Sequence, residues 1–282
     1  MVHAVNPPQA PQATQTQIAN ARMYSATPAV KADWKALLAW VLARAGLPWE
    51  LVDYDAPAPL SVLWARNDLG LAMMCGLPFA QRGERPTLVA APVPSPARYG
   101  GKPVYFTDIV VRADAPYRTL EDTFGGVIGY TLADSMSGGV ALRHHLAPYH
   151  QANGSRLYRK AVGELINARG VITALAEGRI DAGPLDSYYH DLLKAHDPDF
   201  AAQVRTIAST AALPIPPLVA TAALPEETLA KVRAALRATA KATELAPLMQ
   251  RLLLAGFAFP DPADYLPLAA MDGGPAPALD DI

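Results

Sequence analysis

The chain of 282 residues contains only one cysteine, Cys75. An internal disulfide needs two cysteines, and a zinc site made of thiolates needs several. The sequence therefore excludes both. The shortage does not identify the compartment, because proteins without disulfides occur in oxidising and in reducing compartments.

Charged residues are also scarce, at 18% of the chain, and the formal net charge is -2. A nucleic-acid-binding surface normally shows an excess of lysine and arginine, so no nucleic-acid partner is expected. Long hydrophobic runs are missing as well. The most apolar stretches, residues 36–47 and 69–80, are too short or too interrupted by glycine and proline to span a bilayer. The sequence predicts no insertion into a membrane.

The N-terminal segment, residues 1–17, lacks the features of a secretory leader. It contains no lysine or arginine and no apolar central region. Its proline, glutamine and threonine content predicts a disordered tail instead. Two locations stay open on these grounds: the protein is periplasmic if a leader has been removed, and cytoplasmic otherwise.

Hydrophobic residues, by contrast, make up 51% of the chain, and its length suffices for two lobes of roughly 100–150 residues each. Short β-prone runs alternate with helical patterns, which predicts an α/β fold with a largely parallel sheet. The expected strands cover residues 18–24, 51–54, 69–74, 87–93, 103–112, 127–130, 156–162, 180–186, 204–208 and 215–221. The main expected helices cover residues 27–46, 59–64, 164–177, 187–195, 225–236, 245–257 and 263–268.

Ligands of parallel α/β sheets bind beyond the carboxyl ends of the strands. The strands expected at residues 18–24 and 69–74 end near Tyr24 and Gly76. We therefore expect Tyr24 and Gly76 at the rim of a ligand site.

The most informative stretch runs over residues 129–146, where a β-prone run reaches a turn of serine and glycine and a short helix follows. The first N–H groups of a helix have no partner within it, and the helix dipole adds positive potential there. Ser135 and Ser137 add hydroxyl donors, and Gly138 and Gly139 let a ligand approach the backbone. This loop is therefore a candidate anion site. The alternative is a serine that only caps a helix, followed by loop glycines.

Four motifs occur together in a fixed order: Leu69–Pro78, Tyr105–Arg112, Asp134–Gly138 and Ala174–Ser187. In this order and spacing they resemble the phosphate/phosphonate-binding proteins of bacterial ABC transporters. Those proteins belong to the transferrin-like, type II periplasmic binding-protein superfamily. The resemblance covers about residues 18–268. It implies an α/β fold of two lobes, with a ligand cleft between them and two crossover strands near residues 105–112 and 215–221.

The resemblance also implies how the chain is divided and what it does. Lobe one would contain residues 18–109 and 213–282, and lobe two residues 110–212. Such proteins catch their ligand in a cleft that closes by a hinge. Here the ligand would be a small anion or zwitterion, phosphonate-like, phosphate-like or a carboxylate. The protein would deliver it to the membrane subunits of an ABC transporter and would need no cofactor.

The family's Ser-x-Ser-Gly loop holds the anionic group of the ligand, and by resemblance this role falls on Ser135, Ser137 and Gly138. In phosphonate binders the position of Asp186 can accept a hydrogen bond from a ligand amine or a protonated oxygen. Asp186 has the alternative role of capping the helix that begins after it.

Tyr24 and Tyr105 match positions where relatives line the cleft with aromatic residues, although both suit an ordinary core. In one respect the sequence departs from the family. Many relatives have a histidine after the strand expected at residues 156–162, where this chain has Gly163–Asn167. A cleft-facing Glu164 would favour a ligand with a cationic part. The alternative is a solvated residue in the first turn of a helix.

Metal binding and catalysis find little support in the sequence. Adjacent residues on a helix point about 100° apart, so His144 and His145 are poorly placed to share a metal. No metal site and no catalytic residue is predicted. Two other functions stay open. One is an enzyme on the same fold acting on a small anionic metabolite, with Asp186, Glu164 or His145 as its acid or base. The other is a cytoplasmic ligand-sensing module.

Overall fold

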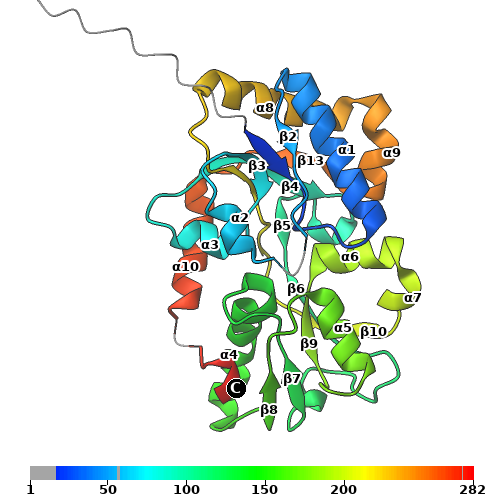
Figure 1. Cartoon of the computed structure of the whole chain (residues 1–282). Coiled ribbons are helices and arrows are strands. Elements are labelled where there is room, and N and C mark those ends of the chain that lie inside the picture. The colour runs from blue at the N-terminus through cyan, green and yellow to red at the C-terminus, as the bar shows by residue number, and fades with distance from the viewer. Residues whose placement is uncertain (1–16, 56–57, 275) are drawn as a thin grey trace, which may run out of the picture.

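The computed structural model describes residues 17–55, 58–274 and 276–282. The disordered tail expected over residues 1–17 lies, apart from Gln17, outside the described residues. Figure 1 shows two lobes, each with its own β-sheet and its own covering helices. The fold is therefore α/β and two-lobed, as expected.

Lobe one is built on a six-stranded sheet in the order β13-β4-β12-β3-β1-β2. The first four strands of the chain run in one direction, and β12 and β13 run against them. Its strands are β1 (Ile18–Asn20), β2 (Glu50–Leu51), β3 (Leu69–Met73), β4 (Thr87–Pro94), β12 (Leu218–Ala220) and β13 (Leu254–Ala258). Its main helices are α1 (Pro28–Ala45), α2 (Leu60–Trp64), α3 (Gly76–Gln81), α8 (Glu226–Ala238), α9 (Ala246–Arg251) and α10 (Leu266–Asp272).

Helix α1 confirms the signals that predicted it. The Val30 N–H donates to the Thr27 hydroxyl at 3.2 Å, Pro28 occupies the first turn, and Gly46 ends the helix at a φ of 67°. Proline suits the first turn because it lacks an N–H, and glycine adopts the left-handed cap without strain. The buried face of this helix packs on the sheet of lobe one.

Strand β1 is shorter than expected, which decides where Tyr24 lies. The side-chain amide of Asn20 donates to the Val52 carbonyl at 2.8 Å, and its side-chain oxygen accepts from the Arg22 N–H at 2.9 Å. Such a side-chain turn competes with strand pairing. The chain therefore turns at the end of the sheet, and Tyr24 lies in that turn rather than in the strand.

Lobe two contains a three-stranded antiparallel sheet, β10-β6-β9, and a parallel pair, β7-β8. A bridge between Ile128 and Ala182 connects the pair to the sheet. Its strands are β6 (Thr107–Arg112), β7 (Val127–Gly129), β8 (Lys160–Val162), β9 (Gly183–Asp186) and β10 (Val204–Ser209). Its helices include α4 (Ala141–Asn153), α5 (Ala168–Ala176), α6 (Ser187–His196) and α7 (Pro198–Ala201).

The two connections between the lobes lie side by side as a short antiparallel pair, β5 (Val104–Tyr105) with β11 (Leu213–Pro214). The crossovers expected at residues 105–112 and 215–221 are therefore misplaced by several residues. The long run breaks at Phe106, whose N–H bonds to the Ser187 hydroxyl at 3.0 Å instead of to a strand. Residues 107–112 of the first expected run form β6 of lobe two, and residues 218–220 of the second form β12 of lobe one.

Two other expectations are wrong. The helix expected over residues 245–257 ends at Arg251, and β13 then pairs with β4 along the sheet edge. The last residues of the chain do not stay with lobe one. Leu279 and Ile282 are buried in a hydrophobic cluster formed by side chains of lobe two. The Ile282 carbonyl also accepts from the Tyr158 N–H at 3.2 Å.

Candidate ligand-binding site between the lobes

The turn of serine and glycine at residues 134–139, which we call the serine loop, lies at the start of a single π-helical turn, Met136–Val140. This turn leads into α4. Ser135 is its N-cap: its hydroxyl accepts from the Gly138 N–H at 3.2 Å, and its carbonyl accepts from the Gly139 N–H at 2.9 Å. The cap interpretation is therefore correct for Ser135. In this conformation two of the expected anion donors are hydrogen-bonded within the loop.

The two glycines of this loop are required by packing. A Cβ at Gly138 would stand 1.7 Å from the Thr131 hydroxyl, and one at Gly139 would stand 2.5 Å from the Leu132 carbonyl. Both glycines are buried. Their absence of a side chain lets the loop pack against the segment after β7.

Ser137 lies at the boundary between the lobes. Its carbonyl accepts from the Thr107 hydroxyl at 2.8 Å, and its side chain lies near the Tyr105 hydroxyl. Tyr105 is 1% exposed, and burial raises its pKa well above the ordinary value. Burial also raises the pKa of the Cys75 thiol of lobe one, an effect that the nearby backbone of Met136 offsets in part. The loop thus lies near both the crossover and lobe one.

Asp186 combines its two expected roles, one with each carboxylate oxygen. Its Oδ1 accepts from the N–H groups of Tyr188 and Tyr189, both at 3.0 Å, and so caps α6. Its Oδ2 accepts from the Tyr24 hydroxyl of lobe one at 3.2 Å. Burial raises the pKa of Asp186 to about 7, although these hydrogen bonds favour the charged form. A carboxylate at the end of β9 therefore spans the cleft through a single long hydrogen bond.

Two expected site residues lie apart from this group. The space that a side chain at Gly76 would need is filled by Leu268, 2.7 Å from the Cβ position, so Gly76 serves the packing of α10 on α3. Glu164 is exposed at a φ of 56° and lies near Tyr130. It is not in the first turn of a helix, because α5 begins after the N-cap Asn167.

A cavity of about 820 Å³ lies at the mouth of the cleft, between the two lobes. Sequence reasoning missed most of its lining, because these residues carry no recognisable motif. From lobe one it is lined by the turn after β1, the start of α1 and the start of α2. From lobe two it is lined by the segment before α5 and by α6. The lining includes the side chains of Arg22, Met23, Lys31, Leu60, Ile166, Arg169 and Tyr189.

Arg169 adds a second hydrogen bond across this mouth. Its Nε donates to the Ala26 carbonyl of lobe one at 3.1 Å, and its Nη2 pairs with Asp197 at 2.6 Å. Its guanidinium also lies 4.7 Å from the ring centre of Phe200. The lobes are thus held together on the cleft side by a few isolated contacts.

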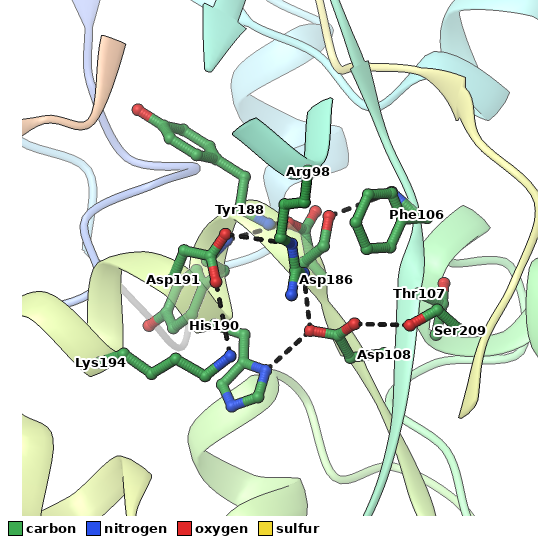
Figure 2. Close-up of polar contacts among 12 residues, drawn as sticks. Arg98, Phe106, Thr107, Asp108, Asp186, Tyr188, His190, Asp191, Lys194 and Ser209 are labelled. Carbon is green, nitrogen blue, oxygen red and sulfur yellow. Dashed lines mark hydrogen bonds and ion pairs between the residues drawn. The ribbon is translucent and has the colours of Figure 1, made fainter. Parts of the chain in front are cut away.

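On the hinge side the lobes share a denser polar group, which we call the hinge cluster: Arg98, Tyr99, Asp108, His190, Asp191 and Ser209. Figure 2 shows Arg98, from the loop after β4, between Asp108 of β6 and Asp191 of α6. Its nitrogens lie 2.8 Å from Asp108 and 3.3 Å from Asp191.

Asp108 is fully buried and receives further hydrogen bonds, from the Ser209 hydroxyl at 2.9 Å and from His190 Nδ1 at 2.9 Å. Burial alone would raise the pKa of Asp108, but the hydrogen bonds from His190 and Arg98 hold it below its ordinary value. The hinge cluster therefore keeps a charged carboxylate in the interior.

The described residues contain no group of three or more metal-ligating side chains that could hold an ion. Nor does any helix in the described ranges have the length and apolar character needed to cross a bilayer.

The sequence profile of the family described as "ABC transporter, phosphonate, periplasmic substrate-binding protein" matches residues 24–265. The chain belongs to this family. Its members are solute-binding proteins, and the two-lobed architecture above is the type II periplasmic-binding-protein fold. The family match spans the serine loop, Asp186 and both crossovers. No curated protein matches the chain in sequence.

Solved structures of phosphonate-binding proteins resemble the chain closely in fold and little in sequence. The binding-protein component of an ABC phosphonate transporter from Pseudomonas aeruginosa is 17% identical, with a TM-score of 0.75 over 91% of this chain and 85% of that chain. PhnD1 from Prochlorococcus marinus, solved with methylphosphonate, is 12% identical, with a TM-score of 0.73 over 91% and 97%. A protein from Xanthomonas citri, bound to ATP, is 20% identical, with a TM-score of 0.64 over 92% and 98%. These likenesses establish the fold of this phosphonate-binding family member.

Proposed function

We propose that this chain is the solute receptor of an ABC importer and captures a small phosphonate or a closely related acid in the interlobe cleft. The acidic group would bind at Ser135, Ser137 and the backbone of the serine loop. Tyr24 and Asp186 would contact the ligand from opposite sides of the cleft. The closed receptor would then deliver its ligand to the membrane subunits of the transporter, which places its work in the periplasm.

The observation that carries this proposal is the convergence of residues from three parts of the chain. Tyr24 comes from lobe one, Tyr105 from the crossover, and Ser137 and Asp186 from lobe two. Asp186 touches Tyr24 and Ser137 lies beside Tyr105. A ligand bound here would contact both lobes at once, and it would therefore favour the closed state in proportion to its contacts with both.

The size of the ligand does not follow from the fold. Similar structures hold methylphosphonate in one case and ATP in another. The proposed function therefore specifies the acidic group of the ligand and leaves its organic substituent open.

We also propose the division of the chain into a discontinuous lobe one, residues 18–106 and 213–278, and lobe two, residues 107–212 with 279–282. Placing the last residues with lobe two rests on the burial of Leu279 and Ile282 in its hydrophobic cluster.

The test is isothermal titration calorimetry with methylphosphonate on the wild type and on Ser135→Ala/Ser137→Ala. Each hydrogen bond to a charged group contributes about 1.5–3 kcal/mol, so the double variant should bind at least about a hundredfold more weakly. It should still fold, since loss of one helix cap costs about 1 kcal/mol. The matched control is Ser61→Ala, an exposed serine in the short helix α2, which should leave the affinity unchanged. Equal affinity of the folded double variant would contradict the proposal.

A further inference from the structure

The cavity at the cleft mouth offers mostly apolar surface to a ligand. Its volume of about 820 Å³ is within the range of about 300–1,000 Å³ typical of small-molecule sites. Met23 and Leu60 of lobe one and Ile166 of lobe two line it, together with the ring of Tyr189. This volume greatly exceeds what a methyl group requires.

The cationic side chains at this mouth already have partners. Lys31 pairs with Asp55 at 2.6 Å, and Arg169 pairs with Asp197 at 2.6 Å. Arg22 donates to the Ala58 carbonyl and also lies over a tyrosine ring. Because two of these three charges are paired with carboxylates within the protein, the cavity offers little net positive charge to a second anionic group and is better suited to an apolar one.

Ile166 is the most unusual residue of this lining. It is 52% exposed, and its φ of 67° lies in the left-handed region, where a β-branched residue is rare. The Asn167 N–H donates to the Leu165 carbonyl at 2.7 Å, which closes a tight turn around Ile166. Glycine would adopt this conformation without strain. Isoleucine is therefore unfavourable for folding at this position, because its apolar side chain is exposed and its backbone is strained.

The surrounding structure holds this turn in place. A Cβ at Gly170 would stand 1.9 Å from the Leu165 carbonyl, and one at Gly163 would stand 2.2 Å from the ring of Tyr130. The Asn167 side chain accepts from the Gly170 N–H at 3.1 Å and caps α5. Strained residues persist only where such packing fixes them, and they concentrate at functional sites.

The cavity adjoins the proposed ligand site directly. Met23 precedes Tyr24, whose hydroxyl bonds to Asp186, and the N–H of Tyr189 bonds to the same carboxylate. A ligand whose acidic group lies at the serine loop would pass this pair and extend its other end into the cavity. Its substituent would then meet Ile166, Leu60 and Met23.

Resting on the proposed function, we propose that this receptor selects phosphonates or phosphate monoesters that carry an aromatic or branched apolar substituent, and that Ile166 determines this selectivity. Ile166 contributes apolar contact at a fixed position on the wall of lobe two. Closure of the cleft would bury the substituent between Ile166 and the apolar residues of lobe one, which is favourable in proportion to the apolar area removed from water.

The test compares two probes, phenylphosphonate and methylphosphonate, by titration calorimetry. The wild type should bind phenylphosphonate at least tenfold more tightly. In Ile166→Gly this preference should fall fivefold or more, with methylphosphonate affinity unchanged within twofold. The variant should fold, because glycine suits the backbone at this position.

Two further variants separate the effect of the Ile166 side chain on ligand preference from the effect of its backbone conformation. Ile166→Asn tolerates the left-handed conformation while keeping a side chain, and it should lose the preference as Ile166→Gly does. Val62→Ala, which changes an exposed apolar residue of α2 that does not line the cavity, should keep it.

A wild type that binds both probes equally, or a preference that survives both Ile166 variants, would overturn the inference while leaving the proposed function intact. Binding of neither probe would overturn both.

Discussion

Two of the regions where the lobes meet are built in opposite ways. On the hinge side, Asp108 is fully buried and receives hydrogen bonds from three side chains, with Arg98 extending the cluster to Asp191. On the cleft side, Asp186 meets lobe one through one bond of 3.2 Å, from Tyr24. The same helix, α6, carries both regions, because Asp186 caps it and Asp191 lies in its second turn.

The difference shows which contact is suited to open. A buried carboxylate that loses one of several partners is left with an unpaired charge, which costs several kcal/mol. A half-buried carboxylate with a raised pKa loses little when one long hydrogen bond breaks, since water or a ligand can replace it. We therefore expect the hinge cluster to persist while the cleft opens and closes.

The largest effect is expected from Asp108→Ala. It removes the central carboxylate of the hinge cluster, leaves Arg98 with Asp191 alone and deprives His190 Nδ1 of its partner, which should lower the free energy of unfolding by about 3–5 kcal/mol. The control is Asp114→Ala, whose carboxylate is exposed and pairs with Arg112, with an expected loss of about 1 kcal/mol or less. Chemical denaturation measures both. Similar losses for the two variants would remove the distinction between the regions.

A matched pair of substitutions gives the next largest effect, because each removes one tyrosine hydroxyl that bonds to an aspartate. Tyr99→Phe breaks the buried bond of 2.7 Å to Asp191 in the hinge cluster and should cost about 1–3 kcal/mol of stability. Its affinity for methylphosphonate should stay within about threefold, since this contact persists in both states.

Tyr24→Phe should behave in the reverse way. Its loss of stability should be below about 1 kcal/mol, while its affinity for methylphosphonate falls at least about fivefold, because Tyr24 would contact the ligand. Denaturation and calorimetry on both variants check the pair. A larger stability loss in Tyr24→Phe than in Tyr99→Phe would reverse the comparison.

A further effect concerns the pH dependence of stability. Because burial raises the pKa of Asp186 to about 7, its proton stays bound in the folded chain up to that pH but leaves the unfolded chain near pH 4. Stability contributed by this group should therefore be present below about pH 4 and lost as the pH rises to about 7.

Asp186→Asn cannot ionise and keeps a capping side chain. It should exceed the wild type in stability by about 1–3 kcal/mol at pH 8, and the difference should shrink as the pH falls to 4. Thermal or chemical unfolding across this range measures it. A constant difference at all pH values would show that Asp186 titrates normally.

Local signals predicted the parts of the fold that depend on neighbouring residues. Pro28 and Gly46 predict the two ends of α1. The acidic residue at the end of β9, Asp186, predicts a helix cap. The helix α5 begins four residues after its predicted start, because Asn167 caps it and Glu164 precedes that cap.

No local sequence pattern predicts the hinge cluster. Asp108 is 82 residues from His190 and 101 from Ser209, so no spacing rule connects them before the lobes are assembled. The same is true of Leu279, whose burial depends on a surface formed by residues far along the chain. The strand β13 was mistaken for helix because only its pairing with β4 distinguishes the two.

The distance between the lobes across the cleft reports directly whether the cleft opens while the hinge cluster persists. Spin labels at Ala36→Cys on α1 and Ala176→Cys at the end of α5, both exposed sites, can report it in a Cys75→Ser background. With methylphosphonate we predict one short distance. Without it we predict an additional longer distance, which Tyr24→Phe populates further and Tyr99→Phe does not. A single distance, identical with and without methylphosphonate and in both variants, would contradict the account.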